Sequence, residues 1–516
     1  MGIPSYFVYL VKNYKSILKE YNKSISINNL YLDSNSIIYD AVQNIKYTKE
    51  NYETKLISFV ISKIKHYIDI IKPTNVIYIA FDGVAPIAKL EQQRNRRYKT
   101  HYTNNIINSN IEKWDTCNIT PGTNFMKKLN EMIRKSFINY KNNKVIVSGS
   151  DEVGEGEHKI FDYIRKNRDL HKNQTSVIYG LDADLIVLTL AHLRYSNNLF
   201  LFRETPYFIN TVDNTLQPNQ LYMMDIYYLA EVILNKVSEN YHEDDFDKII
   251  NDYVLMTFLL GNDFMPHFPA INIRTTGIDI LLNLYSEKFY KNGLFLSNEN
   301  KVIWKNLRKF VQYLSEQEEN LICLEMKKRD KLEKKFKYYK FNNKEEELLN
   351  KPITDRTVEK YINPFDEGWQ VRYYRELFDL EIEDNIKKNI CLNYLEGLEW
   401  NLKYYLDGCY DWRWTYKYNY PPLLIDLYNY IPFFNNDFFN EKIYKPVNEY
   451  TQLSYVLPRN SLQLLPKNIF EKIVLNYEKC FKLDYDIKWS FCRYFWESHV
   501  ILPEINIAEL EKIILN

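Results

Sequence analysis

Short apolar runs alternate with amphipathic stretches from the start of the chain to about residue 290. The runs are almost continuously apolar, as strands buried on both faces of a parallel sheet are. We predict strands at 29–32, 76–81, 145–147 and 177–179. The stretches between them, such as 51–71 and 125–140, repeat apolar residues with helical spacing. This alternation predicts an α/β fold with a mostly parallel central sheet and flanking helices.

The pattern changes after residue 290. A charged stretch covers about 316–360, and such stretches are most often solvated helices or linkers. Residues 361–516 are rich in aromatic residues and mainly helical in spacing, for example at 394–406. We predict three parts, namely an α/β domain at 1–290, a charged helical connection at 291–360, and a mainly helical second segment at 361–516 packed on the first.

Charge and cysteine content narrow the class of protein. The chain has 67 Lys and Arg against 67 Asp and Glu, which excludes a polybasic, non-specific nucleic-acid binder. Its six cysteines contain no Cys-x-x-Cys pair, which argues against a zinc site and against a secreted disulfide scaffold. No apolar run reaches the about 18 residues that a membrane span needs. We therefore expect a soluble, cytoplasmic monomer in a reducing environment.

Carboxylates follow the predicted strands at the point where each strand ends. Asp33 and Asp82 end the first two runs, Asp151 follows the third, and Asp182 and Asp184 follow the fourth. In open parallel sheets, ligands bind outside the carboxyl ends of the strands, so these acids would share one crevice. A single Asp in such a position is more often a helix cap or turn former, and Asp151 is open to that interpretation.

Three more acids join this set. Glu155 and Glu157 lie in Gly154-Glu-Gly-Glu-His-Lys, where the glycines allow a tight path into a helix that begins near His158. Asp263 follows an apolar run at 253–260. So many like charges repel unless cations neutralise them, and oxygen ligands without Cys or clustered His favour Mg²⁺ or Mn²⁺. Two such ions about 3.5–4 Å apart would clamp the attacking and leaving oxygens of a phosphodiester displacement.

A basic helix is predicted directly after Asp82, because Pro86 is well suited to a first helical turn. One face of this helix carries three cations and an amide, at Lys89, Gln93, Arg96 and Arg97. Such a face suits a terminal phosphate, to which Arg offers bidentate hydrogen bonds. An exposed basic helix is the alternative, and the position beside a proposed metal ligand favours the phosphate.

Aromatic residues occupy alternate positions in the second segment, at Tyr410, Trp412, Trp414, Tyr416, Tyr418 and Tyr420. In an extended chain they would form one aromatic face. Stacking on nucleic-acid bases is one interpretation. Core packing is the interpretation that we favour for most of the six, with one Trp reaching a substrate.

Ordered motifs connect these observations along nearly the whole chain. They are Met1-Gly-Ile-Pro-Ser-Tyr-Phe, Leu30-Tyr-Leu-Asp-Ser-Asn, Phe81-Asp-Gly-Val-Ala-Pro, Gln92-Gln-Arg-Asn-Arg-Arg-Tyr, Ile119-Thr-Pro-Gly-Thr-Asn-Phe-Met, Gly154-Glu-Gly-Glu-His-Lys-Ile, Gly180-Leu-Asp-Ala-Asp-Leu-Ile, Leu259-Leu-Gly-Asn-Asp-Phe-Met-Pro-His, Tyr394-Leu-Glu-Gly-Leu-Glu-Trp and Trp412-Arg-Trp-Thr-Tyr-Lys-Tyr-Asn-Tyr-Pro-Pro. With these motifs, the chain resembles the Xrn family of 5′→3′ exoribonucleases.

The resemblance implies a core like that of PIN and flap nucleases, with the second segment completing the active-site pocket. It implies processive hydrolysis of uncapped, single-stranded RNA with a 5′-monophosphate to nucleoside 5′-monophosphates. Two Mg²⁺ ions would be held by catalytic carboxylates at Asp33, Asp82, Glu155, Glu157, Asp182, Asp184 and Asp263. The 5′-monophosphate would be bound by Lys89, Gln93, Arg96 and Arg97. Base stacking would involve Tyr39 and one of Trp412 and Trp414.

The chain departs from the family pattern at a few positions. Tyr39 stands where the family usually has a stacking His, Ser36 where Gly is usual, and Val153 where Pro is usual. The chain stops soon after Leu502-Pro503, without the large C-terminal extension of the cytoplasmic eukaryotic members. Its 45 Tyr residues, with much Ile, Asn and Lys, are typical of an AT-rich genome, and together with the compact length they suggest a large DNA virus or a protist as the source. Two alternatives stay open, a flap-type endonuclease on DNA and a non-enzymatic protein that binds RNA 5′ ends. Protein partners stay open as well.

Overall fold

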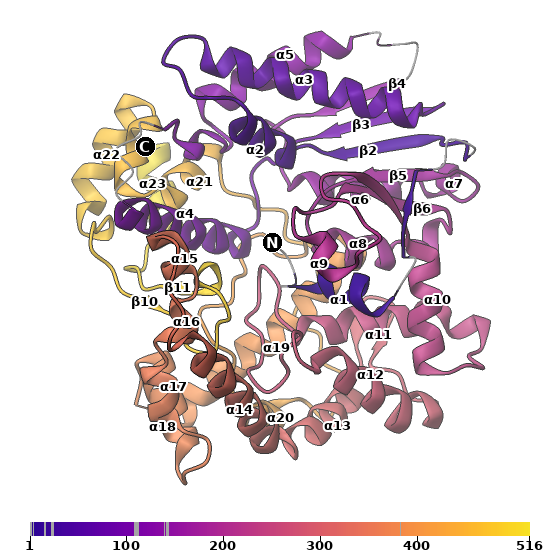
Figure 1. Ribbon diagram of the computed structural model, residues 1–516, viewed down its shortest axis with the longest axis vertical. Helices are drawn as coiled ribbons and strands as arrows, with labels where there is room; N and C mark the ends of the chain where they lie inside the picture. Colours follow the sequence, from indigo (N-terminus) through magenta and orange to yellow (C-terminus); the bar gives the residue numbers. More distant parts are fainter. Residues whose placement is uncertain are drawn as a thin grey trace.

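A seven-stranded sheet forms the centre of the N-terminal domain (Figure 1). The computed structural model describes residues 3, 5–14, 17–21, 25–107, 113–138, 140, 144–381 and 383–516. Met1, Gly2 and Pro4 of the first motif therefore lie outside the described residues. The strands are β1 (Leu18–Glu20), β2 (Asn29–Asp33), β3 (Val76–Ala80), β4 (Lys144–Ser148), β5 (Ser176–Tyr179), β6 (Leu199–Glu204) and β7 (Leu221–Asp225).

The strand order is β1-β7-β6-β5-β2-β3-β4. Strands β2 to β6 pair in parallel, while β7 is antiparallel to β6 and β1 is antiparallel to β7. The four predicted strands correspond to β2, β3, β4 and β5, which confirms the mostly parallel sheet. Strand β1 was not predicted because it has only three residues, two of them exposed, and so forms no apolar run.

Helices cover both faces of the sheet, and the strands supply alternate side chains to each face. Leu30 and Leu32 pack into one core with α2 (Asn35–Asn44), α3 (Tyr52–Ile71) and α5 (Asn124–Phe137). Tyr31 points into the other core, which the helices on the opposite face share. Those helices are α6 (Gly156–Lys166), α8 (Asp184–Ala191) and α10 (Ile226–Val237). The predicted helices at 51–71 and 125–140 correspond to α3 and α5.

The rest of the chain is mainly helical, as predicted. It contains α11 (Phe246–Phe258), α12 (Gly277–Lys288), α13 (Trp304–Ser315), α14 (Glu318–Phe336), α15 (Lys344–Leu349), α16 (Lys351–Thr354), α17 (Thr357–Ile362), α18 (Trp369–Phe378), α19 (Asp384–Asp407), α20 (Leu424–Tyr430), α21 (Glu449–Val456), α22 (Lys467–Tyr477) and α23 (Ile507–Leu515). Four short strands form two small sheets, β8 (Ser297–Asn298) with β9 (Lys301–Val302) and β10 (Ile487–Lys488) with β11 (His499–Val500).

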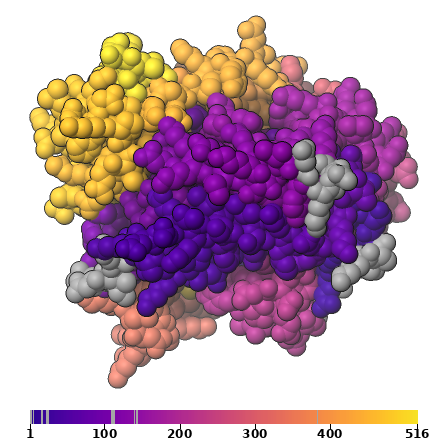
Figure 2. All heavy atoms as spheres, turned by 90° about the horizontal axis from the view of Figure 1, so that it is seen from above, coloured from indigo at the N-terminus to yellow at the C-terminus, as the bar shows by residue number. Residues whose placement is uncertain are grey.

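Two helices join the second segment to the α/β domain. Helix α19 packs against α8 and α11, and α4 (Ile87–Ile107) packs against α15, α21 and β11. In Figure 2 the C-terminal segment lies directly against the N-terminal domain. None of the described helices is long and apolar enough to cross a membrane.

The charged stretch at 316–360 is mainly helical and no residue of 331–347 is buried, which agrees with a solvated helix, but the stretch also contains a buried group of charges. Arg329 on α14 donates to both carboxylate oxygens of Glu359 on α17, and Arg356 donates to one of them. All three residues are buried. The sequence pattern shows only that the stretch is charged, and the partners that bury these charges lie up to 30 residues apart. The divisions at residues 290 and 360 stay predictions.

Residues 410–420 differ from the expected extended face. Among the described residues of this stretch, only Asp411 pairs as a bridge, and no regular strand forms. Trp412, Trp414, Tyr416 and Tyr420 are buried, so this stretch belongs to the core of the second segment.

Candidate active site

Two acids meet where the first turn of α6 approaches the sheet. The Gly156 N–H donates to Oδ1 of Asp82 at 2.7 Å. A Cβ at Gly156 would lie 2.6 Å from Oδ1 of Asp33 and 3.5 Å from Oδ1 of Asp82. Only glycine therefore lets this backbone approach both carboxylates. Asn35 binds Asp82 from the opposite side, since its Nδ2 donates to Oδ2 at 2.5 Å.

The first turn of α6 carries the next two acids. Glu155 and Glu157 are buried. Oε1 of Glu155 accepts a hydrogen bond from the Tyr404 hydroxyl on α19 at 2.6 Å. Oε2 of Glu157 and Oδ1 of Asp33 are buried and have no hydrogen-bond partner among the described residues. Buried polar atoms are normally paired, so these two oxygens are available for a ligand.

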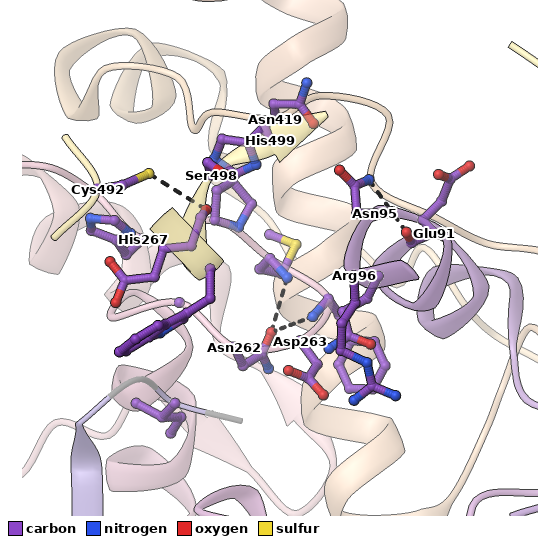
Figure 3. Close-up of a pocket in the computed structure, with 18 of the residues that line it drawn as sticks. Glu91, Asn95, Arg96, Asn262, Asp263, His267, Asn419, Cys492, Ser498 and His499 are labelled. Atoms are coloured by element: carbon purple, nitrogen blue, oxygen red, sulfur yellow. Dashed lines mark hydrogen bonds between the residues drawn. The ribbon is translucent and has the colours of Figure 1, made fainter. Parts of the chain in front are cut away.

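The remaining acids come from the loops after β5 and α11. Asp184 is buried at the start of α8, and its Oδ1 accepts from the Ile3 N–H at 2.9 Å. Asp182 and Asp263 line a cavity of about 1900 Å³. Gly261 has φ +81°, a conformation open to glycine, and it turns the chain after α11 towards Asp263. Figure 3 shows Asp263 beside Asn262 on one wall of this cavity.

Mutual repulsion and burial shape the titration of these groups. Burial, reinforced by Asp82, raises the pKa of Asp33 well above its usual value. Burial raises the pKa of Glu157 in the same way, and it raises the pKa of Asp184 to about 7. The pKa values of Asp182 and Asp263 are lowered instead, the latter by Lys89 against the effect of burial. The raised values therefore indicate too little positive charge at Asp33, Glu157 and Asp184 in particular.

Lys89 supplies part of that charge. Its Nζ lies 2.5 Å from Oε2 of Glu155 and 2.8 Å from Oδ2 of Asp263. Burial alone would lower the pKa of Lys89, but Asp263 and the two glutamates raise it well above its usual value. The predicted phosphate ligand Lys89 thus points at the acids in this structure.

The donor set fits a divalent cation. The cluster offers only oxygen atoms, two of them buried and unpaired, and hard cations prefer such ligands. No three acidic, His or Cys side chains already converge on one point within the part of the chain that the structure describes. Lys89 bridges Glu155 and Asp263 and so fills the space between two of the predicted ligands.

The basic face on α4 adjoins the acids. Helix α4 begins at Ile87, directly after Pro86, as predicted. Gln93 is buried and its Oε1 has no described partner, and Nη1 of Arg97 also lacks one. Although burial opposes it, the pKa of Arg96 is raised by Tyr39 and Asp263. Figure 3 shows Arg96 and Asp263 at the same part of the cavity.

A stack of rings links the acids to the second segment. His158 stacks on Tyr404 at 3.7 Å, Tyr404 on Trp400 at 4.6 Å, and Trp400 on Trp414 at 5.0 Å. The Ile87 N–H donates to the Trp412 carbonyl, which ties the aromatic segment to the start of α4. Base stacking by Tyr39, Trp412 or Trp414 stays a prediction. Sequence reasoning missed Tyr404, because its partner Glu155 is 249 positions away.

Asp151 lies apart from this cluster. It is exposed and forms two hydrogen bonds of 2.8 Å with Arg134. The structure therefore agrees with the interpretation of Asp151 as a turn residue.

A row of acids at the edge of a parallel sheet, beside a basic helix face, is the arrangement of a metal-dependent nuclease. Residues 1–205 match the family described as "XRN 5'-3' exonuclease N-terminus", and residues 243–363 and 354–514 match "Xrn1 helical domain". The chain therefore belongs to the Xrn family.

Relatives in several eukaryotes agree with this assignment. The chain is 27% identical to "5'-3' exoribonuclease 2 homolog" of Drosophila melanogaster, across 100% of the chain and 71% of that protein. It is 26% identical to "5'-3' exoribonuclease 1" of Saccharomyces cerevisiae, across 90% of the chain and 40% of that protein. It is 29% identical to "5'-3' exoribonuclease 1" of Homo sapiens, across 99% of the chain and 34% of that protein. The family supports 5′→3′ exoribonuclease function and does not favour the flap-endonuclease or non-enzymatic alternatives.

Proposed function

We propose that this chain hydrolyses single-stranded RNA from a 5′-monophosphate end, processively and with two divalent cations, preferably Mg²⁺. The observation that carries the proposal is the contact between the basic face of α4 and the acidic row. Lys89 on α4 lies 2.5 Å from Glu155 and 2.8 Å from Asp263, so a phosphate held at α4 would place the next phosphodiester over the carboxylates.

The chain's own residues prepare substrate and site. Gln93, Arg96 and Arg97 bind the terminal phosphate, with Nη1 of Arg97 as a buried donor that has no described acceptor. The seven predicted carboxylates would hold the cations, which neutralise charge at the scissile phosphate and lower the pKa of water when bound. Tyr404 and the Gly156 N–H fix the orientation of Glu155 and Asp82 by hydrogen bonds.

Matched RNAs with different 5′ ends test this function. We expect rapid release of nucleoside 5′-monophosphates from 5′-monophosphate RNA, and slow release from 5′-hydroxyl, 5′-triphosphate and capped RNA. A triphosphate or cap adds bulk and negative charge beside the acids, and a hydroxyl forfeits the charged hydrogen bonds. Equal rates on triphosphate and monophosphate RNA would refute the 5′-end specificity, and cleavage of circular RNA would point to an endonuclease.

Cation dependence is tested on the same RNAs. We expect activity to stop in EDTA and to return with Mg²⁺ or Mn²⁺. Asp182→Ala should abolish nucleotide release while RNA binding stays measurable, and an unchanged rate would refute its role as a ligand.

A further inference from the structure

Arg203 is a buried cation that has unpaired hydrogen-bond donors. It lies on β6, is 6% exposed and lines the same cavity as Asp182. Its Nη2 donates to the Leu181 carbonyl at 2.8 Å, while Nε and Nη1 have no acceptor among the described residues. The Phe7 ring lies 3.8 Å from the guanidinium carbon and holds the group in place. Burying a charged donor without an acceptor is costly, so such a group indicates a missing anion.

The sheet register places Arg203 level with the acids. Phe202 pairs with Tyr179, and Tyr179 pairs with Leu32, so the next residues along these strands, Arg203 and Asp33, stand at one level. The preceding residues, Leu32 and Phe202, pack into the core on the α2–α3 side of the sheet. Because successive side chains of a strand point to opposite faces, Asp33 and Arg203 point to the side of α6 and α8. Two strand spacings separate them, which is about 10 Å.

The strand order gives this arrangement a direction. Across the carboxyl edge, the order β6-β5-β2-β3 presents Arg203, then Asp182, then Asp33, then Asp82, and α4 follows β3. The predicted 5′-phosphate face on α4 is therefore at one end of the acidic row, and Arg203 is at the other. An RNA strand whose 5′ end is held at α4 and whose scissile bond lies over the acids continues towards β6.

We propose that the Arg203 guanidinium binds the phosphodiester that follows the scissile bond, on the 3′ side of the acidic row. Guanidinium donors form strong, charge-assisted hydrogen bonds to phosphate oxygens, and Nε and Nη1, on two edges of the Arg203 group, each keep a hydrogen for such a bond. This contact holds the strand at both ends of the acids. The inference rests on the 5′→3′ polarity of the proposed function.

A phosphate scan separates this contact from a structural role. The probes are 5′-monophosphate RNA oligomers, one unmodified and one with a neutral methylphosphonate at the second internucleotide linkage, the first being scissile. Equilibrium binding is measured in EDTA, where hydrolysis is blocked. We expect Arg203→Met to bind unmodified RNA roughly 10- to 100-fold more weakly, as expected for a lost hydrogen bond to a charged group. On the methylphosphonate RNA, wild type and variant should bind equally.

Several results would overturn the proposal. Equal weakening on both RNAs would show that Arg203 only supports the loop at Leu181. Weaker binding of a free nucleoside 5′-monophosphate to Arg203→Met would show that the group serves released product instead. If Arg203→Met fails to fold, Arg203→Lys, which keeps the charge but loses the fixed guanidinium donors, is tested in the same cycle.

The control and the activity assay complete the experiment. Arg194→Met is the matched control, because Arg194 also donates to one backbone carbonyl and also lies over an aromatic ring, but does not line the cavity. It should leave both affinities unchanged. Wild-type degradation of 5′-monophosphate RNA is measured in parallel. Its absence would count against the proposed function, whereas normal degradation with no Arg203 effect on binding would count against this inference alone.

Discussion

The acidic row and the Arg329–Glu359 cluster are both buried groups of charge, and they are satisfied in opposite ways. Each oxygen of Glu359 accepts two hydrogen bonds, from Arg329, Arg356 and the Phe491 N–H. In the acidic row, oxygens of Asp33 and Glu157 have no described partner. A cluster that only supports the fold completes its own bonding, whereas one that binds a ligand leaves atoms for the ligand to complete.

We call the acidic row the open cluster and the Arg329–Glu359 group the closed cluster. Asp33→Asn tests the open cluster and should have the largest effect on activity. It removes a carboxylate that the cations need, and we expect the rate of nucleotide release to fall about 1000-fold, equivalent to several kcal/mol of transition-state stabilisation. The free energy of unfolding should not fall, because the raised pKa of Asp33 shows that its charge is costly in the folded protein. Single-turnover kinetics with the cation present measure the rate. Urea unfolding at pH 8 without metal measures the free energy of unfolding. Loss of stability together with activity would contradict the comparison.

Glu359→Ala tests the closed cluster and should have the opposite outcome. It leaves two buried guanidinium groups without their shared acceptor, which costs about 3–5 kcal/mol of unfolding free energy. Urea unfolding measures this loss.

Asp151→Ala is the control for Glu359→Ala, because it removes an exposed ion pair worth about 1 kcal/mol or less. If the two variants lost stability equally, the buried cluster would have no special structural role.

The sequence predicts the open cluster better than the closed one. Asp33, Asp82, Asp182 and Asp184 each follow a predicted strand, and parallel pairing brings strand ends together without any further information. The helix predicted from the spacing of Lys89 to Arg97 is likewise present, as part of α4. Local pattern and one topological rule are enough for these residues.

Contacts that depend on tertiary packing are not predictable in this way. The hydrogen bond from Tyr404 to Glu155, the pairing of Arg329 with Glu359, and the position of Arg203 beside Leu181 all need the packed chain. In the sequence, Arg329 is one cation in a charged stretch, and nothing local distinguishes it from its solvated neighbours. The same limit hid the fact that Lys89 points at the acids.

A pH titration distinguishes the open cluster further. Asp184 has a pKa of about 7 in the folded protein, above its usual value of 3.8, because it is buried near Asp263. A raised carboxyl pKa contributes stability below the unfolded pKa, and this contribution is lost as pH rises through 7. Without metal, we expect unfolding free energy to fall by about 2 kcal/mol more between pH 5 and pH 7 in wild type than in Asp184→Asn.

Asp252 and Glu318, whose pKa values burial also raises, add their own pH dependence to the unfolding free energy of both proteins. Subtracting the curve of Asp184→Asn from that of wild type removes this shared contribution. Saturating Mg²⁺ should abolish the difference in slope, since the cation compensates the ionised carboxylate. Parallel curves without metal would contradict the assignment of Asp184 to an undercompensated cluster.

Tyr404→Phe tests the point at which the second segment reaches the acids, and it should have the smallest effect. The change removes only the hydroxyl that donates to Glu155, while the ring can still stack between His158 and Trp400. Partners that orient a metal ligand affect metal affinity by about tenfold or more. We therefore expect about tenfold more Mn²⁺ for half-saturation, measured both by direct binding and by activity, with an unchanged rate at saturation.

Tyr394→Phe is the matched control, because that hydroxyl on the same helix donates to the Pro266 carbonyl outside the acidic row. If both variants shifted the Mn²⁺ requirement equally, Tyr404 would stabilise α19 without orienting Glu155, and the open cluster would depend on the sheet edge alone.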